Sequence, residues 1–203
     1  MEEYLFMKSF IQLLSQGNFF RKAYAIVLQV LAALVVIAGL VSWIQVWKLV
    51  SGAATDAILG IIIFQFLFVI AIYMVVHAIF IRAGDISALP DSDYTVIPIV
   101  SISLKLIGEI YACFVAAVSV GGGIAMWLKS DAFFMIRGSV PFIPIFGGGE
   151  GFFGGLLFIV GGLFAAFVVL VFFYFLAETV VVMVDIAKDT KITRQVAEKY
   201  NKK

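Results

Sequence analysis

The stretch ILGIIIFQFLFVIAIYMVVHAIFI, residues 58–81, is apolar almost throughout and contains no Asp, Glu, Lys or Arg. A bilayer hydrocarbon core about 30 Å thick is crossed by about 20 helical residues, each rising about 1.5 Å. This run is therefore long enough to cross a membrane as one helix. Three further apolar runs of similar length, with few charges, occupy about residues 25–47, 103–128 and 155–185. The sequence thus predicts an all-α membrane protein with four transmembrane helices.

The composition agrees with this prediction. The chain has 203 residues, of which 64% are hydrophobic and 13% charged. Soluble globular domains carry about 25% charged residues, so a water-soluble fold is not expected. The formal net charge of +1 gives no electrostatic basis for binding nucleic acid. We expect the chain to lie in a lipid bilayer.

The cations are distributed unevenly between the two sides of the expected membrane. One side has only Lys48, Lys129 and Arg137. The positive-inside rule places the other, cation-rich side in the cytoplasm, so that both termini are cytoplasmic. That side carries Lys8, Arg21, Lys22, Arg82, Lys105, Lys188, Lys191, Arg194, Lys199, Lys202 and Lys203.

Turn-forming residues divide the spans into two helical hairpins. We expect the first hairpin at 19–86 and the second at 99–190, joined by a cytoplasmic connector at 87–98 that is rich in Pro, Asp and Ser. Small residues recur in the two hairpins at one constant offset, which indicates tandem copies in the same orientation. The matching residues are Ala32, Ala33 and Gly39 in the first hairpin and Ala116, Ala117 and Gly123 in the second.

The segments outside the spans carry their own patterns. Residues 1–18 have Phe and Leu at helical spacing, which indicates an amphipathic helix on the inner membrane surface or on the cytoplasmic part of a partner. The outer connection 129–155 is rich in Gly, Phe and Pro, and either enters the interface, covers the bundle or meets another protein. The basic tail 191–203 is expected to continue the fourth helix. Its cations either contact anionic headgroups or are simply solvated.

Ionisable residues inside spans are the candidate functional residues, because charge in hydrocarbon is costly. His77, Glu109 and Glu178 lie roughly 6–12 Å from the cytoplasmic ends of their helices, which predicts a polar layer at one depth. Tyr174 and Asp185 fall on the same face of the fourth helix as Glu178 and complete this layer.

Two interpretations of the polar layer remain open. One is a cytoplasmic vestibule for protons or cations, lined by His77, Glu109 and Glu178. The other is pairing between helices, in which a Glu side chain meets His77, Arg82 or Lys105.

Small residues at intervals of four form ridges that let helix backbones approach closely. The ridges indicate tight packing within a hairpin or, alternatively, a contact between copies of the chain. They consist of Gly108, Ala112 and Ala116 on the third span, and of Gly161 with Ala165 and Gly162 with Ala166 on the fourth.

No motif predicts catalysis or a cofactor. A single His and the lone Cys113 do not make a metal site, and the glycine run 147–151 lacks the Lys-Ser/Thr of a phosphate loop. We expect no enzyme activity and no cofactor.

The end of the fourth span reads Leu176-Ala-Glu-Thr-Val-Val-Val-Met-Val-Asp-Ile-Ala-Lys-Asp-Thr190. This segment resembles the closing helix of a family of small uncharacterised bacterial membrane proteins built on a two-helix hairpin. In that family the second helix ends in a similar Leu-x-Glu run, followed by Ile-Ala and a polar Asx-Thr. The present chain differs by its two hairpins and its long Gly/Phe loop. The resemblance implies a bacterial inner membrane and carries no activity.

These observations favour a non-enzymatic membrane subunit or scaffold that associates with itself or with a larger membrane complex. The alternative is a small oligomeric channel or transporter for protons or cations, with the polar layer lining its vestibule.

Overall fold

The computed structural model describes residues 17–50, 55–90, 96–128 and 151–201. Within these ranges it contains four helices and no strand. By length and composition, all four helices are long and apolar enough to cross a membrane, which confirms the prediction of an all-α protein with four membrane-spanning helices. The helices are α2 (Gly17–Val50), α3 (Thr55–Ser87), α4 (Val96–Trp127) and α6 (Phe152–Asn201).

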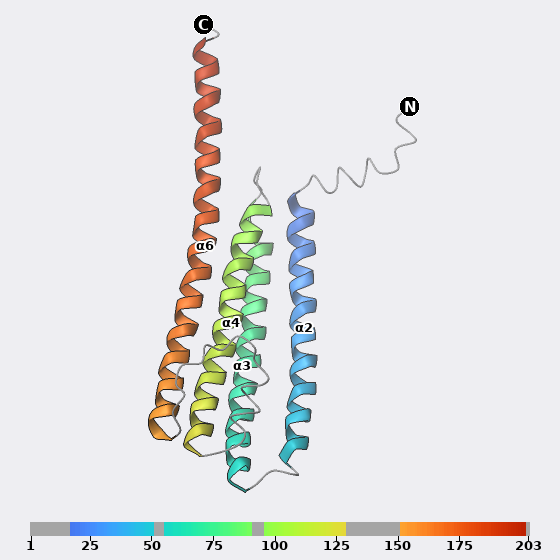
Figure 1. The fold of residues 1–203 in the computed structure, drawn as a ribbon. Coiled ribbons are helices and arrows are strands. Elements are labelled where there is room, and N and C mark those ends of the chain that lie inside the picture. The colour runs from blue at the N-terminus through green and yellow to red at the C-terminus, as the bar shows by residue number, and fades with distance from the viewer. Residues whose placement is uncertain (1–16, 51–54, 91–95, 129–150, 202–203) are drawn as a thin grey trace, which may run out of the picture.

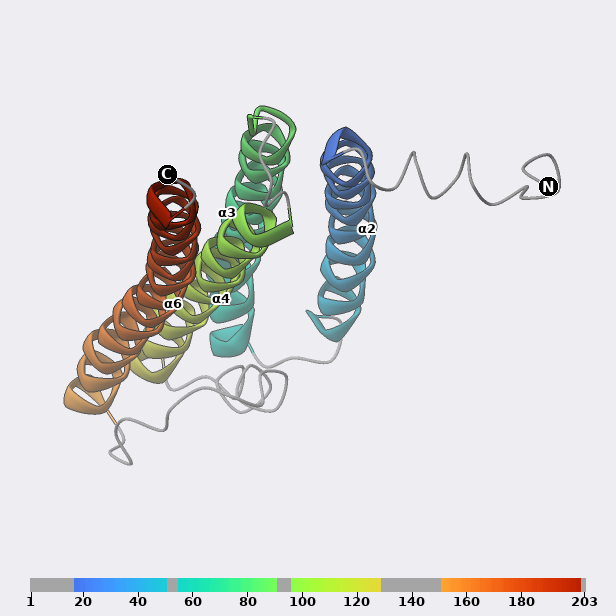
Figure 2. The same cartoon turned by 90° about the horizontal axis from the view of Figure 1, so that it is seen from above.

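The helices stand side by side in the order α6, α4, α3 and α2 (Figure 2). Helix α4 packs most extensively on α6, α3 packs on both α2 and α4, and α2 touches α4 only slightly. The arrangement is an open row and not a closed four-helix bundle. In lipid, apolar side chains gain little by leaving the hydrocarbon, so no hydrophobic force closes the row.

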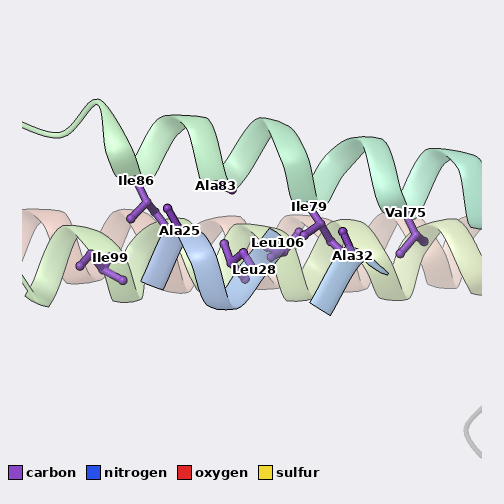
Figure 3. Close-up of a cluster of buried hydrophobic side chains, with 9 residues drawn as sticks. All are labelled: Ala25, Leu28, Ala32, Val75, Ile79, Ala83, Ile86, Ile99 and Leu106. Atoms are coloured by element: carbon purple, nitrogen blue, oxygen red, sulfur yellow. The ribbon is translucent and has the colours of Figure 1, made fainter. Parts of the chain in front are cut away.

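Successive helices run in opposite directions, so α2 and α4 start at the end where α3 and α6 finish (Figure 1). We call this the Arg82 end. A cluster of buried apolar residues from α2, α3 and α4 begins here, and Ala32, Ile79 and Ile86 in it are completely buried (Figure 3). Ala25 and Ala32 of α2 belong to the same buried cluster as Ile79 and Ile86 of α3.

At the opposite end, Trp127 joins α4 to α6. Its indole Nε1 donates a hydrogen bond to the Phe152 carbonyl at 2.9 Å, and its ring stacks on the Phe152 ring with centroids 5.4 Å apart. The two helices are therefore fastened directly where α4 ends and α6 begins.

Helix α4 begins at Val96, earlier than the predicted start at residue 99. Pro98 lies in its first turn, where the missing N–H costs no helical hydrogen bond. The predicted amphipathic helix 1–18, apart from its last two residues, and loop residues 129–150 lie outside the described residues, so those two predictions stay predictions. So does the structure of connector residues 91–95.

Helix α6 continues unbroken far past the last apolar residues of its span, as the sequence predicted. No Gly or Pro follows Gly162 in the sequence, so nothing there kinks the helix. Residues 186–201, here called the α6 arm, project beyond the ends of the other three helices (Figure 1). Every side chain described in the arm is exposed.

Candidate functional site

The small-residue ridges lie where α4 and α6 meet. Gly108 and Gly162 are buried there, and Ala166 is only 5% exposed. A Cβ on Gly108 would come within 2.7 Å of the Phe173 Cβ, and one on Gly162 would collide with the Ser119 side chain. These glycines allow α4 and α6 to pack closely together. The other ridge residues, Ala112, Ala116, Gly161 and Ala165, are half-buried.

Arg82 of α3 is the centre of a polar network near the Arg82 end. Its Nε donates to Oε2 of Glu109 on α4 at 3.1 Å, and its Nη2 donates to Glu109 Oε1. The Tyr174 hydroxyl of α6 donates to Glu109 Oε1 at 2.6 Å and accepts from Arg82 Nη2 at 3.0 Å. Three helices are thus joined by side chains that satisfy one another.

Two further charges flank this network. Asp85, one turn after Arg82 on α3, accepts from Arg82 Nη1 at 2.8 Å. Lys105, one turn before Glu109 on α4, places its Nζ 5.4 Å from the centre of the Tyr174 ring, a cation–π contact. Two cations therefore balance two carboxylates. We call these five residues the Arg82 network.

The structure brings together only part of the predicted polar layer. Glu109 and Tyr174 meet in the Arg82 network, whereas Glu178 and Asp185 are exposed on α6. His77 is also exposed, two residues from both Val75 and Ile79, which are buried. Two residues turn a helix by about 200°, so His77 lies on the face of α3 opposite the packed one.

Of the pairings weighed from the sequence, the structure contains the one between Glu109 and Arg82. The sequence pattern indicated Arg82 as one of three partners for a Glu side chain and did not indicate Asp85 as a further partner. The signal that could have found them is the i, i+3 spacing of Arg82 and Asp85 on one helix, at the depth of Glu109 on the next. In such a pair the Arg guanidinium bonds the Asp carboxylate and still has N–H donors left for a second carboxylate.

Other polar side chains in the spans bond to backbone carbonyls. Ser101 donates to the Ala177 carbonyl at 3.0 Å, and Gln65, which is 2% exposed, donates to the Trp43 carbonyl at 2.9 Å. Arg21, at the start of α2, donates to the Leu89 carbonyl after α3. Each bond connects two helices or a helix and its neighbouring turn, which is the common use of polar groups in hydrocarbon.

The chemistry open to the Arg82 network is limited by its own bonding. Both Glu109 oxygens already accept hydrogen bonds from Arg82. Among the described residues, no three His, Cys, Asp or Glu side chains gather as metal ligands would. The network therefore acts as a clamp that holds α3, α4 and α6 together.

The fold and this clamp define a class: a multi-pass membrane protein, by the length and composition of its four apolar helices. Comparisons with protein-family models, with curated proteins and with solved structures find no match to this chain.

We expect Tyr174→Phe to lower the free energy of unfolding by about 1 kcal/mol, because Glu109 loses one donor while the ring under Lys105 remains. Thermal unfolding in mild detergent measures this change. Tyr200→Phe, which removes a hydroxyl from a residue 78% exposed in the α6 arm, is the matched control and should have no effect. Equal transition temperatures for the two variants would contradict the role of the Tyr174 hydroxyl.

Proposed function

We propose that this protein is a non-enzymatic multi-pass membrane subunit or scaffold, which associates with itself or with a larger membrane complex and uses the α6 arm to hold a partner protein. The observation that carries the proposal is the arm itself. Sixteen helical residues reach about 24 Å past the span at about 1.5 Å each. A rigid exposed helix fixed to the membrane is suited to docking.

One side of the arm is apolar although it lies beyond the membrane span. Ile192, Val196 and Tyr200 are 58%, 48% and 78% exposed and follow one another at intervals of four, so they share a helix face. Helices bound in grooves present such faces to their partners. This stripe, residues 192, 196 and 200, is therefore the proposed docking surface.

The charges beside the stripe indicate what kind of partner fits. The arm holds four cations, Lys188, Lys191, Arg194 and Lys199, against the two carboxylates Asp189 and Glu198. Electrostatic complementarity favours a partner groove with acidic margins. A protein partner is favoured over the bilayer surface, because an arm without Gly or Pro does not bend back to the headgroups.

We further propose that the Arg82 end faces the cytoplasm and that the membrane is a bacterial inner membrane. The excess of Lys and Arg near this end supports the orientation. The resemblance of residues 176–190 supports the bacterial setting. We also propose that the chain is a tandem pair of hairpins, α2 with α3 and α4 with α6. The extensive antiparallel packing of α4 on α6 supports the second hairpin, while α3 packs on both α2 and α4.

The docking proposal predicts that Ile192→Ser, Val196→Ser and Tyr200→Ser together weaken partner binding about tenfold or more, as loss of the central apolar anchors of an interface does. Native mass measurement after extraction in mild detergent compares the bound mass of variant and unchanged chain. The control is Lys191→Ser with Glu198→Ser, which alters the opposite side of the arm and keeps the net charge. A clean monomer with no bound partner, or equal losses in variant and control, would overturn the proposal.

A further inference from the structure

We infer that the outward face of α3 is a contact surface between two copies of this chain, with His77 at its polar centre. The inference deepens the proposed function, because it depends on the protein associating with itself. It starts from an anomaly. An imidazole on a lipid-facing helix surface has no partner in hydrocarbon, yet His77 is exposed on the face of α3 opposite the packed one.

The depth of His77 in the span makes the exposure of its imidazole to lipid energetically costly. His77 lies five residues toward the membrane centre from Arg82, about 7.5 Å by helical rise. Its ring stacks on Tyr73, with centroids 5.9 Å apart and planes at 14°. Parallel stacking does not satisfy the in-plane donor and acceptor of an imidazole. Ionisable residues inside spans almost always face protein or a wet cavity, so another surface is expected to cover this one.

The exposed residues around His77 have the spacing of a helix–helix seam. Phe66, Ile70, Tyr73, His77 and Phe80 follow one another at intervals of four, three, four and three. A mean interval of 3.5 residues keeps one stripe in contact with a parallel neighbouring helix. The four apolar or aromatic members, Phe66, Ile70, Tyr73 and Phe80, are 68%, 40%, 67% and 51% exposed. We call these five residues the α3 seam.

A second copy is the occupant that brings the His77 imidazole a hydrogen-bond partner at the same depth. All copies enter the membrane in one orientation, so two α3 helices related by a two-fold axis along the membrane normal run parallel and meet at equivalent residues. A neutral imidazole has one N–H donor and one bare nitrogen, so the His77 of one copy donates to that of the other. One polar position in an apolar seam also fixes the register of the pair.

Cysteine cross-linking tests the seam directly. Cys113 is the only cysteine, so Cys113→Ala provides a cysteine-free background. In that background, Ile70→Cys places one thiol in the seam, and Val41→Cys places one on the exposed face of α2. Gly39 and Ile72 are in contact, so the two thiols lie at similar depth. With copper phenanthroline in native membranes, we expect covalent dimers from Ile70→Cys and at least tenfold fewer from Val41→Cys.

His77→Ala in the Ile70→Cys chain distinguishes a specific interface from random collisions between copies in the membrane. Loss of one hydrogen-bonded polar pair in a membrane should weaken self-association about three- to thirty-fold. The thermal unfolding of the monomer should stay unchanged, because His77 lies outside the Arg82 network. Equal dimer yields with and without His77, or equal yields from the two cysteine positions, would overturn the seam.

The outcomes also distinguish the seam from the proposed function. Absence of the Ile70→Cys dimer, together with a native mass above that of one chain, refutes the seam and leaves the scaffold proposal standing. That result would assign the α3 face to another membrane protein or to lipid headgroups. Absence of both the dimer and any added mass refutes both proposals.

Discussion

Arg82→Leu is expected to lower the free energy of unfolding by about 3–5 kcal/mol, because it leaves the Glu109 carboxylate without its cation at a protein interior. The Arg82 and Glu109 side chains are only 18% and 19% exposed, so water compensates little. Asp85 and the Tyr174 hydroxyl each lose an Arg82 donor as well. Three helices depend on this one guanidinium, so α6 should loosen from α3 and α4 together.

The measurement is thermal or denaturant unfolding in mild detergent, combined in a double-mutant cycle with Glu109→Leu. Arg82→Leu with Glu109→Leu should recover most of the loss, because an apolar pair of similar volume replaces a buried ion pair at little cost. Arg194→Leu is the control: it breaks a 3.0 Å ion pair whose side chains are 82% and 60% exposed, and such pairs contribute little. Similar losses for Arg82→Leu and Arg194→Leu would refute the clamp.

The depth of the polar residues was predictable from the sequence, whereas their direction was not. Counting helical rise places His77 and Glu109 at similar depth. In a soluble helix an apolar stripe would then identify the packed face, but a membrane helix is apolar on every side. The structure turns Glu109 toward Arg82 and His77 away from the row. The sequence does not give this rotation, so it could not select which of His77, Arg82 and Lys105 pairs with a Glu side chain.

The small residues, by contrast, did predict which faces of the helices pack together. The ridge residues Gly108 and Gly162 are buried between α4 and α6, because a backbone without side chains is what permits close approach in lipid.

The residues at which helices begin and end were harder to predict near prolines. Pro98 suggested a boundary, yet α4 begins two residues before it, at Val96. A single sequence does not distinguish a proline in the first turn of a helix from a proline in the connector before it, because proline is common at both positions.

The remaining prediction concerns how tightly α4 and α6 meet. Gly123→Ala is expected to lower the free energy of unfolding by about 1–3 kcal/mol, as overpacking of a close contact does. A Cβ on Gly123 would lie 2.7 Å from the Gly155 carbonyl oxygen, and one on Gly155 would lie 2.6 Å from the Gly123 carbonyl oxygen. The Ile159 side chain lies nearer still to the Cβ on Gly123, and the Trp127 indole nearer still to the Cβ on Gly155. The two carbonyl oxygens are backbone atoms that no side-chain rotation moves, so the helices themselves must separate.

Gly84→Ala supplies a control that makes the same chemical change in another helix. A Cβ on Gly84 meets no atom within 4 Å. This substitution should therefore raise the free energy of unfolding by about 0.5–1 kcal/mol, because alanine restricts the unfolded chain and favours helix. Thermal unfolding of the two variants in one detergent should move in opposite directions from the unchanged chain. Stabilisation by Gly123→Ala would mean that α4 and α6 are not in backbone contact, and the Trp127–Phe152 junction beside them would then have to hold the hairpin without that contact.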